Sequence, residues 1–237
     1  MKICAYSIPE ISSGKRNLKD SRLDQVHNIT KSKKETYIQV ELAAEDSILD
    51  ADAILALKDS RTDLILKDLE FVETRLSRSD DESEKALLTK LKDILEKEEF
   101  ISKAGLTQEE IQWLSKYGLI TIKPITVADR GELEAFDALL ARAVAEAGFI
   151  SFFTTGEKET RAWLIKKSST AWEASGSIHS DIQKGFIRAE IISLNDFIQC
   201  GGESQAKQAG KLRLEQKDYL MQDADLANFR FNKTVSK

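Results

Sequence analysis

The chain has 237 residues, of which 41% are hydrophobic and 32% are charged, and its formal net charge is −5. That hydrophobic share supports a packed core and argues against wholesale disorder, and no apolar run approaches the roughly 18 residues of a membrane span. The N-terminus lacks a signal-peptide pattern, and Cys4 and Cys200 lie far apart, so we expect reduced thiols in a cytoplasmic protein without a disulfide framework or a metal site.

The charge is unevenly distributed along the chain. Residues 149–237 carry 13 basic and 11 acidic side chains, a net charge of +2, so the preceding residues carry a net charge of −7. Within that acidic part, residues 1–35 hold 8 basic and 4 acidic side chains. The acidic excess therefore lies in the middle of the chain, and both ends are mildly basic. Ordinary surface variation and a true basic face both explain this distribution.

Short β-type runs alternate with polar segments in the first part of the chain. The runs at 2–8 and 36–42 predict strands, and the continuous apolar run at 53–57 predicts a buried strand. The polar stretch 11–19 predicts a loop or a ragged turn. Residues 20–29 are compatible with one helix that carries an apolar face.

The middle of the chain is predicted to be helical. Apolar residues recur at helical spacing from Leu64 to Leu76. Ser79 and Glu82 then have the form of a capping box, and the helix that they would open carries Leu87, Leu91, Ile94 and Leu95. Two amphipathic helices joined by a short polar turn predict an antiparallel hairpin whose apolar faces pack against each other.

A second helical segment follows this hairpin. Thr107 and Glu110 form a further capping box, and Gly118 is a suitable residue for the end of that helix. Residues 120–128 are β-branched and apolar, and Pro124 within them predicts an edge strand or a bend. A helix that ends at Gly148 completes this part of the chain.

The pattern changes at about residue 150 to short strands and tight turns. Strands are predicted at 150–153, 160–165, 186–193 and 228–231, and helices near 170–183 and 204–214. We therefore place a domain boundary near residue 148.

Four segments in this last third form a specific set of motifs. They are FFTTGEKETRAW at 152–163, GSIHSDIQKGFIRAEII at 176–192, AGKLRLEQKDY at 209–219 and DADLANFRFN at 223–232. In this order and spacing they resemble the C-terminal TGS-type domain of the YchF / Obg-like ATPase family. Fainter similarity extends upstream at 20–24, 52–54, 68–76 and 118–124, so the chain resembles a family member from which pieces have been deleted.

The resemblance implies an α+β fold. Residues 1–148 would form a truncated α/β domain of the P-loop GTPase type, with an antiparallel helical arm at about 62–118. Residues 149–237 would form a TGS-like β-grasp domain. In relatives this domain is tied to ribosome-linked or RNA-linked proteins, so the resemblance implies a partner of that class.

The expected phosphate-binding loop is altered. Such a loop needs glycines, a lysine for the β- and γ-phosphates and a hydroxyl group for magnesium. By the resemblance, residues 9–16 take its place, and Gly14 and Lys15 keep the expected types. Pro9 replaces the first glycine and has no amide hydrogen. Arg16 replaces the hydroxyl residue and cannot ligate a cation.

Two further nucleotide-binding elements of the family are also altered. Glu41 stands where the family has the aspartate of an Asp-x-x-Gly motif, and Ala44 replaces the glycine. Asp129 replaces the asparagine that reads the base, and a carboxylate cannot donate to a purine ring nitrogen. Glu132 keeps the family's glutamate. The nucleotide-binding candidates are thus degenerate, and we expect them to be non-functional: Gly14, Lys15, Glu41 and Glu132.

Basic residues of the last third are candidates for contacts with RNA or the ribosome. If several of them share one face they can contact phosphates, but they are interleaved with glutamates, and solvated surface charges are the alternative. The candidates are Lys158, Arg161, Lys184, Arg188, Lys207, Lys211 and Arg213.

His179 and two tryptophans need a separate interpretation. No nucleophile and acid with recognisable spacing accompany His179, so we interpret it as a structural turn or helix cap. Trp163 and Trp172 are interpreted as core or domain-junction residues in preference to base-stacking platforms. The sequence offers no catalytic residue.

The predicted function is that of a non-catalytic YchF-like protein that binds the ribosome or structured RNA through its TGS-like domain and needs no cofactor. One alternative is a divergent nucleoside triphosphatase that uses ATP or GTP with magnesium through Lys15 and Glu41. A second alternative is a protein-interaction adaptor. A membrane partner is not expected.

Overall fold

The computed structural model describes residues 1–232, which form two compact units. The N-terminal unit contains residues 1–16 and 39–147, and the C-terminal unit contains residues 17–38 and those from 148 onward. The boundary between residues 147 and 148 lies close to residue 148, where the sequence suggested a domain break. Residues 17–38, however, group with the C-terminal unit, whereas the expected division had assigned them to the first domain.

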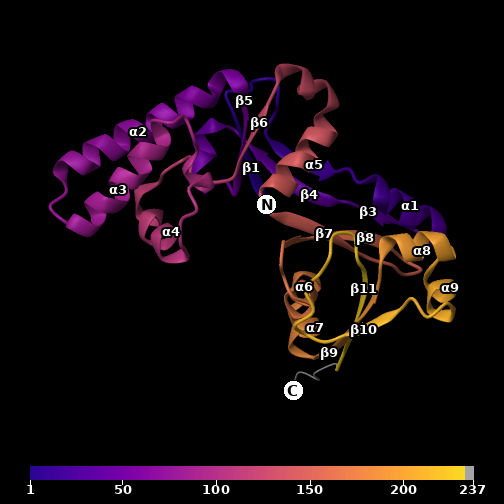
Figure 1. Ribbon diagram of the computed structural model, residues 1–237. Coiled ribbons are helices and arrows are strands. Elements are labelled where there is room, and N and C mark those ends of the chain that lie inside the picture. The colour runs from indigo at the N-terminus through magenta and orange to yellow at the C-terminus, as the bar shows by residue number, and fades with distance from the viewer. Residues whose placement is uncertain (233–237) are drawn as a thin grey trace. The chain divides into compact units, whose positions relative to one another are not determined.

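A five-stranded sheet forms the centre of the N-terminal unit (Figure 1). Its strand order is β2 (Gly14–Leu18), β4 (Ile38–Ala43), β1 (Lys2–Tyr6), β5 (Ala53–Leu57) and β6 (Ile125–Ala128). The strands β1, β4, β5 and β6 run parallel. Every residue of β5 is buried, as the continuous apolar run at 53–57 predicted.

Two strands of this sheet correct or refine the sequence interpretation. Residues 11–19 were expected to be a loop, but β2 occupies their second half and forms one edge of the sheet. The strand β6 forms the other edge and begins directly after Pro124. An edge strand or a bend was expected for this segment, because proline has no backbone N–H with which to donate to a neighbouring strand.

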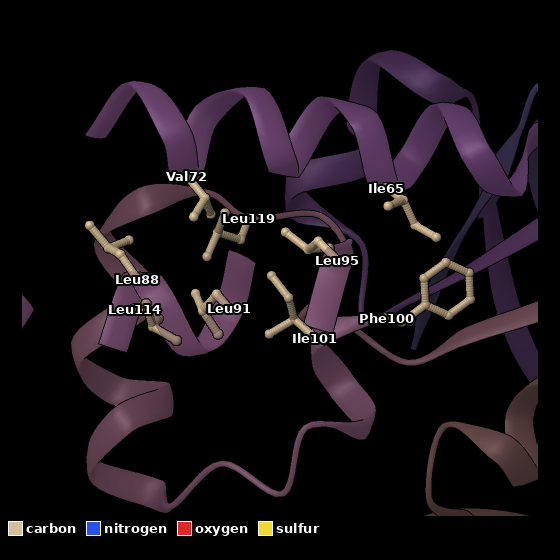
Figure 2. Packing of buried hydrophobic residues seen from close by; sticks show 9 residues of the cluster. All are labelled: Ile65, Val72, Leu88, Leu91, Leu95, Phe100, Ile101, Leu114 and Leu119. Atoms are coloured by element: carbon tan, nitrogen blue, oxygen red, sulfur yellow. The ribbon is translucent and has the colours of Figure 1, made fainter. Parts of the chain in front are cut away.

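The helical arm contains α2 (Arg61–Arg78), α3 (Glu82–Leu95) and α4 (Gln108–Leu114). Figure 2 shows the apolar side chains that join these helices, with Val72 toward Leu88 at one end of the cluster and Ile65 toward Phe100 at the other. The expected hairpin packing is confirmed, because this cluster consists of Ile65, Val72, Leu88, Leu91, Leu95, Phe100, Ile101, Leu114 and Leu119.

One of the two expected capping boxes of the arm is wrong. The N-cap of α3 is Asp81, whose carboxylate accepts from the backbone N–H groups of Ser83 and Glu84. Ser79 lies two residues earlier, and its hydroxyl donates to the Glu84 carboxylate at 2.5 Å. The predicted role of Ser79 as the cap is therefore taken by Asp81, which directly precedes the helix and whose carboxylate reaches its first free amides.

The remaining helix-end predictions for this unit hold. The capping box between Thr107 and Glu110 is present at the start of α4. Gly118 ends the following turn with φ 62°, a left-handed conformation that favours glycine. The unit is completed by α5 (Phe136–Glu146) and by short 3₁₀ segments at Glu45–Asp50, Lys58–Ser60, Ile101–Lys103, Ser115–Tyr117 and Arg130–Ala135.

The C-terminal unit is built on a mixed six-stranded sheet. Its order is β10 (Arg213–Glu215), β9 (Phe186–Ile192), β11 (Leu226–Phe231), β7 (Phe149–Thr154), β8 (Thr160–Lys166) and β3 (Glu35–Thr36). The pairs β11–β7 and β8–β3 are parallel, and the others are antiparallel.

Up to residue 232, the helices of the C-terminal unit are α1 (Ser21–Thr30), α6 (Ala171–Ile178), α7 (Ser180–Lys184), α8 (Leu194–Cys200) and α9 (Glu203–Gln208). The single helix expected at 170–183 is broken at His179. The helix expected at 204–214 ends at Gln208, and the residues after it form β10, which pairs with β9. The helix α8 was not predicted.

Residues 17–38 belong to this unit because their contacts lie there. Leu23 and Val26 of α1 are fully buried, and Arg22 donates hydrogen bonds to Ser151 and Asp223. The hydroxyl of Ser32 donates to Thr160 at 2.9 Å. None of the helices in the described residues has the length and apolar content needed to cross a membrane.

Candidate functional site

The carboxyl ends of the parallel strands are the usual ligand-binding edge of such a sheet. In the N-terminal unit, β1 ends at Tyr6, and Ser7 follows in a left-handed conformation with φ 52°. The segment from Ser7 to Ser13 contains no glycine. It leads into β2 and not into a helix. A triphosphate cradle needs successive inward amides and a helix N-terminus, and β1 is followed by neither in the described residues.

Gly14 and Lys15 lie at the start of β2. The sequence analysis had placed them in a loop, so this part of the expectation is corrected by the structure. Both residues are exposed. In the described residues, Lys15 therefore belongs to an exposed strand and not to a loop that opens a helix, where a phosphate-binding lysine lies.

Three of the four predicted nucleotide-binding residues nevertheless line one hollow. This hollow has a volume of about 500 Å³ and is lined by Ser13, Gly14, Lys15, Glu41, Leu42, Ala43, Ala44, Asp46 and Ser47. Gly14, Lys15 and Glu41 therefore lie around one hollow, although the sequence analysis did not anticipate the strand that carries two of them.

Carboxylates dominate the surroundings of this hollow. Glu41 pairs with Lys2 at 3.7 Å, and Asp46 has no ionic partner in the described residues. Glu45, next to Asp46, pairs with Lys67 at 3.3 Å. Burial, together with the charges of Glu45 and Asp46, raises the pKa of the Cys4 thiol to about 11. A triphosphate would meet these acidic groups without a set of backbone donors.

Glu132, the fourth predicted residue, is held by local contacts. Its carboxylate accepts from the backbone N–H of Asp129 at 2.8 Å and from Arg142 at 2.7 Å. Asp129 in turn pairs with Lys58 at 2.7 Å. Glu132 and Asp129 thus form a capping box, and Glu132 is not among the residues that line the hollow.

The basic candidates of the C-terminal unit fall into two groups. Three are engaged within the unit: Arg161 lies 4.1 Å over the Trp163 ring, Lys211 pairs with Asp196 at 3.1 Å, and Arg213 contacts Tyr219 and Asp225. The other four are exposed and have no ionic partner in the described part of the chain: Lys158, Lys184, Arg188 and Lys207.

The four unpaired cations come from different elements. Lys158 lies in the turn between β7 and β8, Lys184 ends α7, Arg188 lies in β9 and Lys207 lies in α9. Arg188 is directly opposite Arg230 of β11, a cation that the sequence analysis did not select. Arg230 pairs with Glu190 at 2.9 Å, so Arg188 keeps its charge available.

His179 and the tryptophans complete the candidate residues. His179 is the N-cap of α7, and its Nδ1 accepts from the Asp181 backbone N–H at 3.1 Å. The expected structural role is thus confirmed. Trp163 is packed against the core around Phe152. Trp172 is 42% exposed, so it is not a core residue, and its alternative assignment to a domain junction stays a prediction. Its position in the sequence, two residues after Thr170, did not indicate which way the side chain faces.

The comparisons with known proteins agree with this architecture. The family model YchF-GTPase_C, described as "Protein of unknown function (DUF933)", matches residues 149–232. Among solved structures, that of the Schizosaccharomyces pombe YchF GTPase superposes with a TM-score of 0.73 at 19% identity, and the match covers 94% of this chain and 90% of that chain. This likeness shows the fold.

Curated relatives extend the similarity over most of the chain. The ribosome-binding ATPase YchF of Haemophilus influenzae is 32% identical over 233 residues, which covers 72% of this chain and 64% of the relative. The protein of the same name from Bacillus subtilis is 32% identical over 246 residues, which covers 76% of this chain and 67% of the relative. The chain thus spans less than two thirds of the length of the Haemophilus relative, and it belongs to the YchF family.

Proposed function

We propose that this protein is a non-catalytic member of its family that binds the ribosome through its C-terminal unit and no longer binds nucleotide. One observation carries the proposal: β1 leads through a glycine-free segment into the exposed edge strand β2. Phosphoryl transfer depends almost entirely on positioning and on electrostatic stabilisation by such a loop and its magnesium ion. Without the loop, the sheet keeps its architecture and loses its nucleotide-binding function.

The alignments support the loss of a segment. The match to the Haemophilus protein runs over 233 positions, yet 72% of the 237 residues of this chain is only about 171 residues. About 60 positions of the relative therefore face gaps in this chain. A shortened nucleotide-binding region accounts for such gaps, because β1 and β2 are joined by only seven residues, from Ser7 to Ser13.

The ribosome is the partner that the relatives' names suggest, since they are called ribosome-binding ATPases. The C-terminal unit is the part that the family model matches. Four exposed cations without ionic partners in the described residues supply charge for phosphate contacts on its surface. Such contacts with phosphates weaken as the salt concentration rises. The proposal includes binding to structured RNA outside the ribosome through the same cations.

Co-sedimentation with ribosomes at low and at moderate salt tests the proposal. We expect the full chain to sediment with ribosomes at low salt, and Lys184→Glu with Arg188→Glu to weaken this binding. Lys15→Glu is the matched control, because it reverses an exposed lysine of the N-terminal unit. Failure of the wild-type protein to sediment at every ionic strength would remove the proposal.

A second candidate function rests on the hollow that Lys15 and Glu41 share. It is a residual nucleoside triphosphatase that uses ATP or GTP with magnesium, as the names of the relatives suggest. Calorimetric titration of the full chain separates the two candidates. Micromolar, magnesium-dependent binding that disappears in Lys15→Ala would overturn the non-catalytic proposal. Partners that survive nuclease treatment would instead favour a protein-interaction adaptor.

A further inference from the structure

Trp172 is an exposed aromatic side chain that is held in place at two points. It lies in the first turn of α6, next to the capping residue Thr170, and 42% of it is exposed. Its indole N–H donates to the Gln183 carbonyl at 3.0 Å. Its backbone N–H donates to the Lys217 carbonyl at 3.2 Å. The ring is therefore ordered although it is open to solvent.

The two segments that hold Trp172 each supply a lysine. Lys184 directly follows Gln183, and Lys217 provides the second anchoring carbonyl. Both lysines are exposed, and in the described part of the chain neither has an ionic partner. Leu220, 51% exposed, pairs by a β-bridge with Thr170, two residues before Trp172.

Two carboxylates, those of Glu173 and Asp218, lie close to Trp172 in the sequence or on neighbouring segments. Glu173 turns back toward the helix start, where its carboxylate accepts from the backbone N–H and the hydroxyl of Thr170. Asp218 is exposed next to Lys217. The formal charges of Lys184 and Lys217 are balanced by those of Glu173 and Asp218, so stacking and not charge must supply most of any affinity.

Trp163 shows why the two tryptophans differ. Its ring is stacked with Phe152 at 6.4 Å and lies under the Arg161 guanidinium at 4.1 Å. Within the described residues, no aromatic ring and no cation stacks on Trp172. Only Trp172 therefore offers a free aromatic face.

We infer that Trp172 is a stacking platform for an unpaired RNA base, with Lys184 and Lys217 contacting the flanking phosphates. The inference rests on the proposed function and names the contact that the C-terminal unit would make. Proteins read single-stranded RNA by stacking its bases on aromatic side chains beside a basic track. An ordered ring suits this role because little rotamer entropy is lost when a base stacks on it.

Fluorescence anisotropy with a labelled ten-nucleotide oligouridylate tests the inference on the full chain. We expect Trp172→Ala to weaken binding about tenfold, since stacking on one aromatic residue accounts for about 5- to 150-fold in affinity. Trp172→Phe keeps an aromatic face and retains most of the affinity. Lys184→Ala with Lys217→Ala lowers the slope of log affinity against log salt by about 0.7 per lysine.

Lys97→Ala with Lys103→Ala is the matched control, because it removes two exposed lysines of the N-terminal unit and leaves binding unchanged. Circular dichroism and thermal melting of each variant identify any loss of folding, and Trp172→Phe retains the test if Trp172→Ala is unstable. Equal affinity of Trp172→Ala and wild type for the oligonucleotide overturns the inference, as does equal binding of single-stranded and duplex RNA.

Ribosome co-sedimentation of the same variants separates this inference from the proposed function. If Trp172→Ala sediments like wild type while Lys184→Glu with Arg188→Glu does not, the stacking site is refuted and ribosome binding stands. If wild type does not sediment at all, the proposed function fails. Retention of oligouridylate binding by Trp172→Ala together with loss of a nuclease-resistant partner would assign this face to a protein contact and refute the RNA site.

Discussion

Asp68 allows a quantitative prediction for the helical arm. It lies in α2 and is 3% exposed. Its carboxylate accepts from the backbone N–H of Ile120 at 2.9 Å, from the backbone N–H of Thr121 at 2.7 Å and from the Thr121 hydroxyl at 2.6 Å. One side chain thus holds the segment that leads from the arm back to β6.

Replacing Asp68 with alanine leaves three donors without their acceptor. Each stranded buried donor costs about 1–3 kcal/mol. Part of this cost is recovered, because burial raises the pKa of Asp68 and the charged form is therefore partly penalised in the folded state. We expect Asp68→Ala to lower the free energy of unfolding of the N-terminal unit by about 3 kcal/mol.

Urea denaturation followed by tryptophan fluorescence measures this loss. Trp113 packs against the arm core, so replacing Trp163 and Trp172 by phenylalanine leaves it as the reporter of the N-terminal unit. Thr121→Val in the same background removes the hydroxyl that donates to Asp68 and accepts weakly from the Ile101 backbone N–H at 3.4 Å, and its cost is about 1 kcal/mol. A loss below about 1 kcal/mol for Asp68→Ala would refute the assigned role, since that is the contribution of a single ordinary hydrogen bond.

Three further predictions concern the N-terminal unit. Leu91→Ala, at a fully buried position of the arm, lowers the unfolding free energy by about 2–5 kcal/mol, and Leu87→Ala, at a partly buried one, costs less; equal values by urea denaturation would contradict the packing. Hydrogen bonds, first of all from Arg75, lower the pKa of Glu84 from 4.5 to about 2. Its contribution to the free energy of unfolding is therefore complete above pH 4.5 and is lost as the pH falls toward 2. Glu84→Gln reduces the loss of stability over that acidic range, and an unchanged pH dependence would exclude Glu84 as its source. ATP with magnesium at about 100 times a dissociation constant adds about 2.7 kcal/mol of stability, so the absence of a shift in melting temperature with about 1 mM ATP is the expected result, and a clear rise would show nucleotide binding.

Local periodicity made much of the fold predictable. The residues of α2 and α3 repeat at helical spacing, and they form the arm core that was expected. The strand at 53–57 is apolar throughout because it is buried on both faces of a parallel sheet. Thr107 with Glu110 and Gly118 were recognisable because capping depends on a few residues close in sequence.

The elements that were missed depend on distant partners. The strand β2 consists of GKRNL, and four of its five residues are exposed. An edge strand of this kind does not alternate apolar and polar residues, so its polar sequence cannot be distinguished from that of a loop. Similarly, β10 exists through its pairing with β9, which local propensity does not encode.

The candidate nucleotide site was predictable in composition and not in geometry. Lys15 and Glu41 were selected by comparison with a phosphate loop and a metal-binding motif, and they do line the same hollow. Whether Gly14 and Lys15 belong to a cradle or to a strand depends on the chain that follows β1. That choice is made by hydrogen bonding across the sheet, because β2 neighbours β4.

The assignment of residues 17–38 to the C-terminal unit determines how that unit must be isolated. A fragment that begins at residue 149 lacks α1 and β3. The edge of β8 would then be unpaired, and surfaces that Leu23 and Val26 cover would face water. In the complementary fragment, which ends at residue 148, both side chains would be exposed instead. Loss of ribosome binding after such a truncation would therefore report misfolding as readily as a lost contact, and point substitutions such as Lys184→Glu in the full chain are the sounder test.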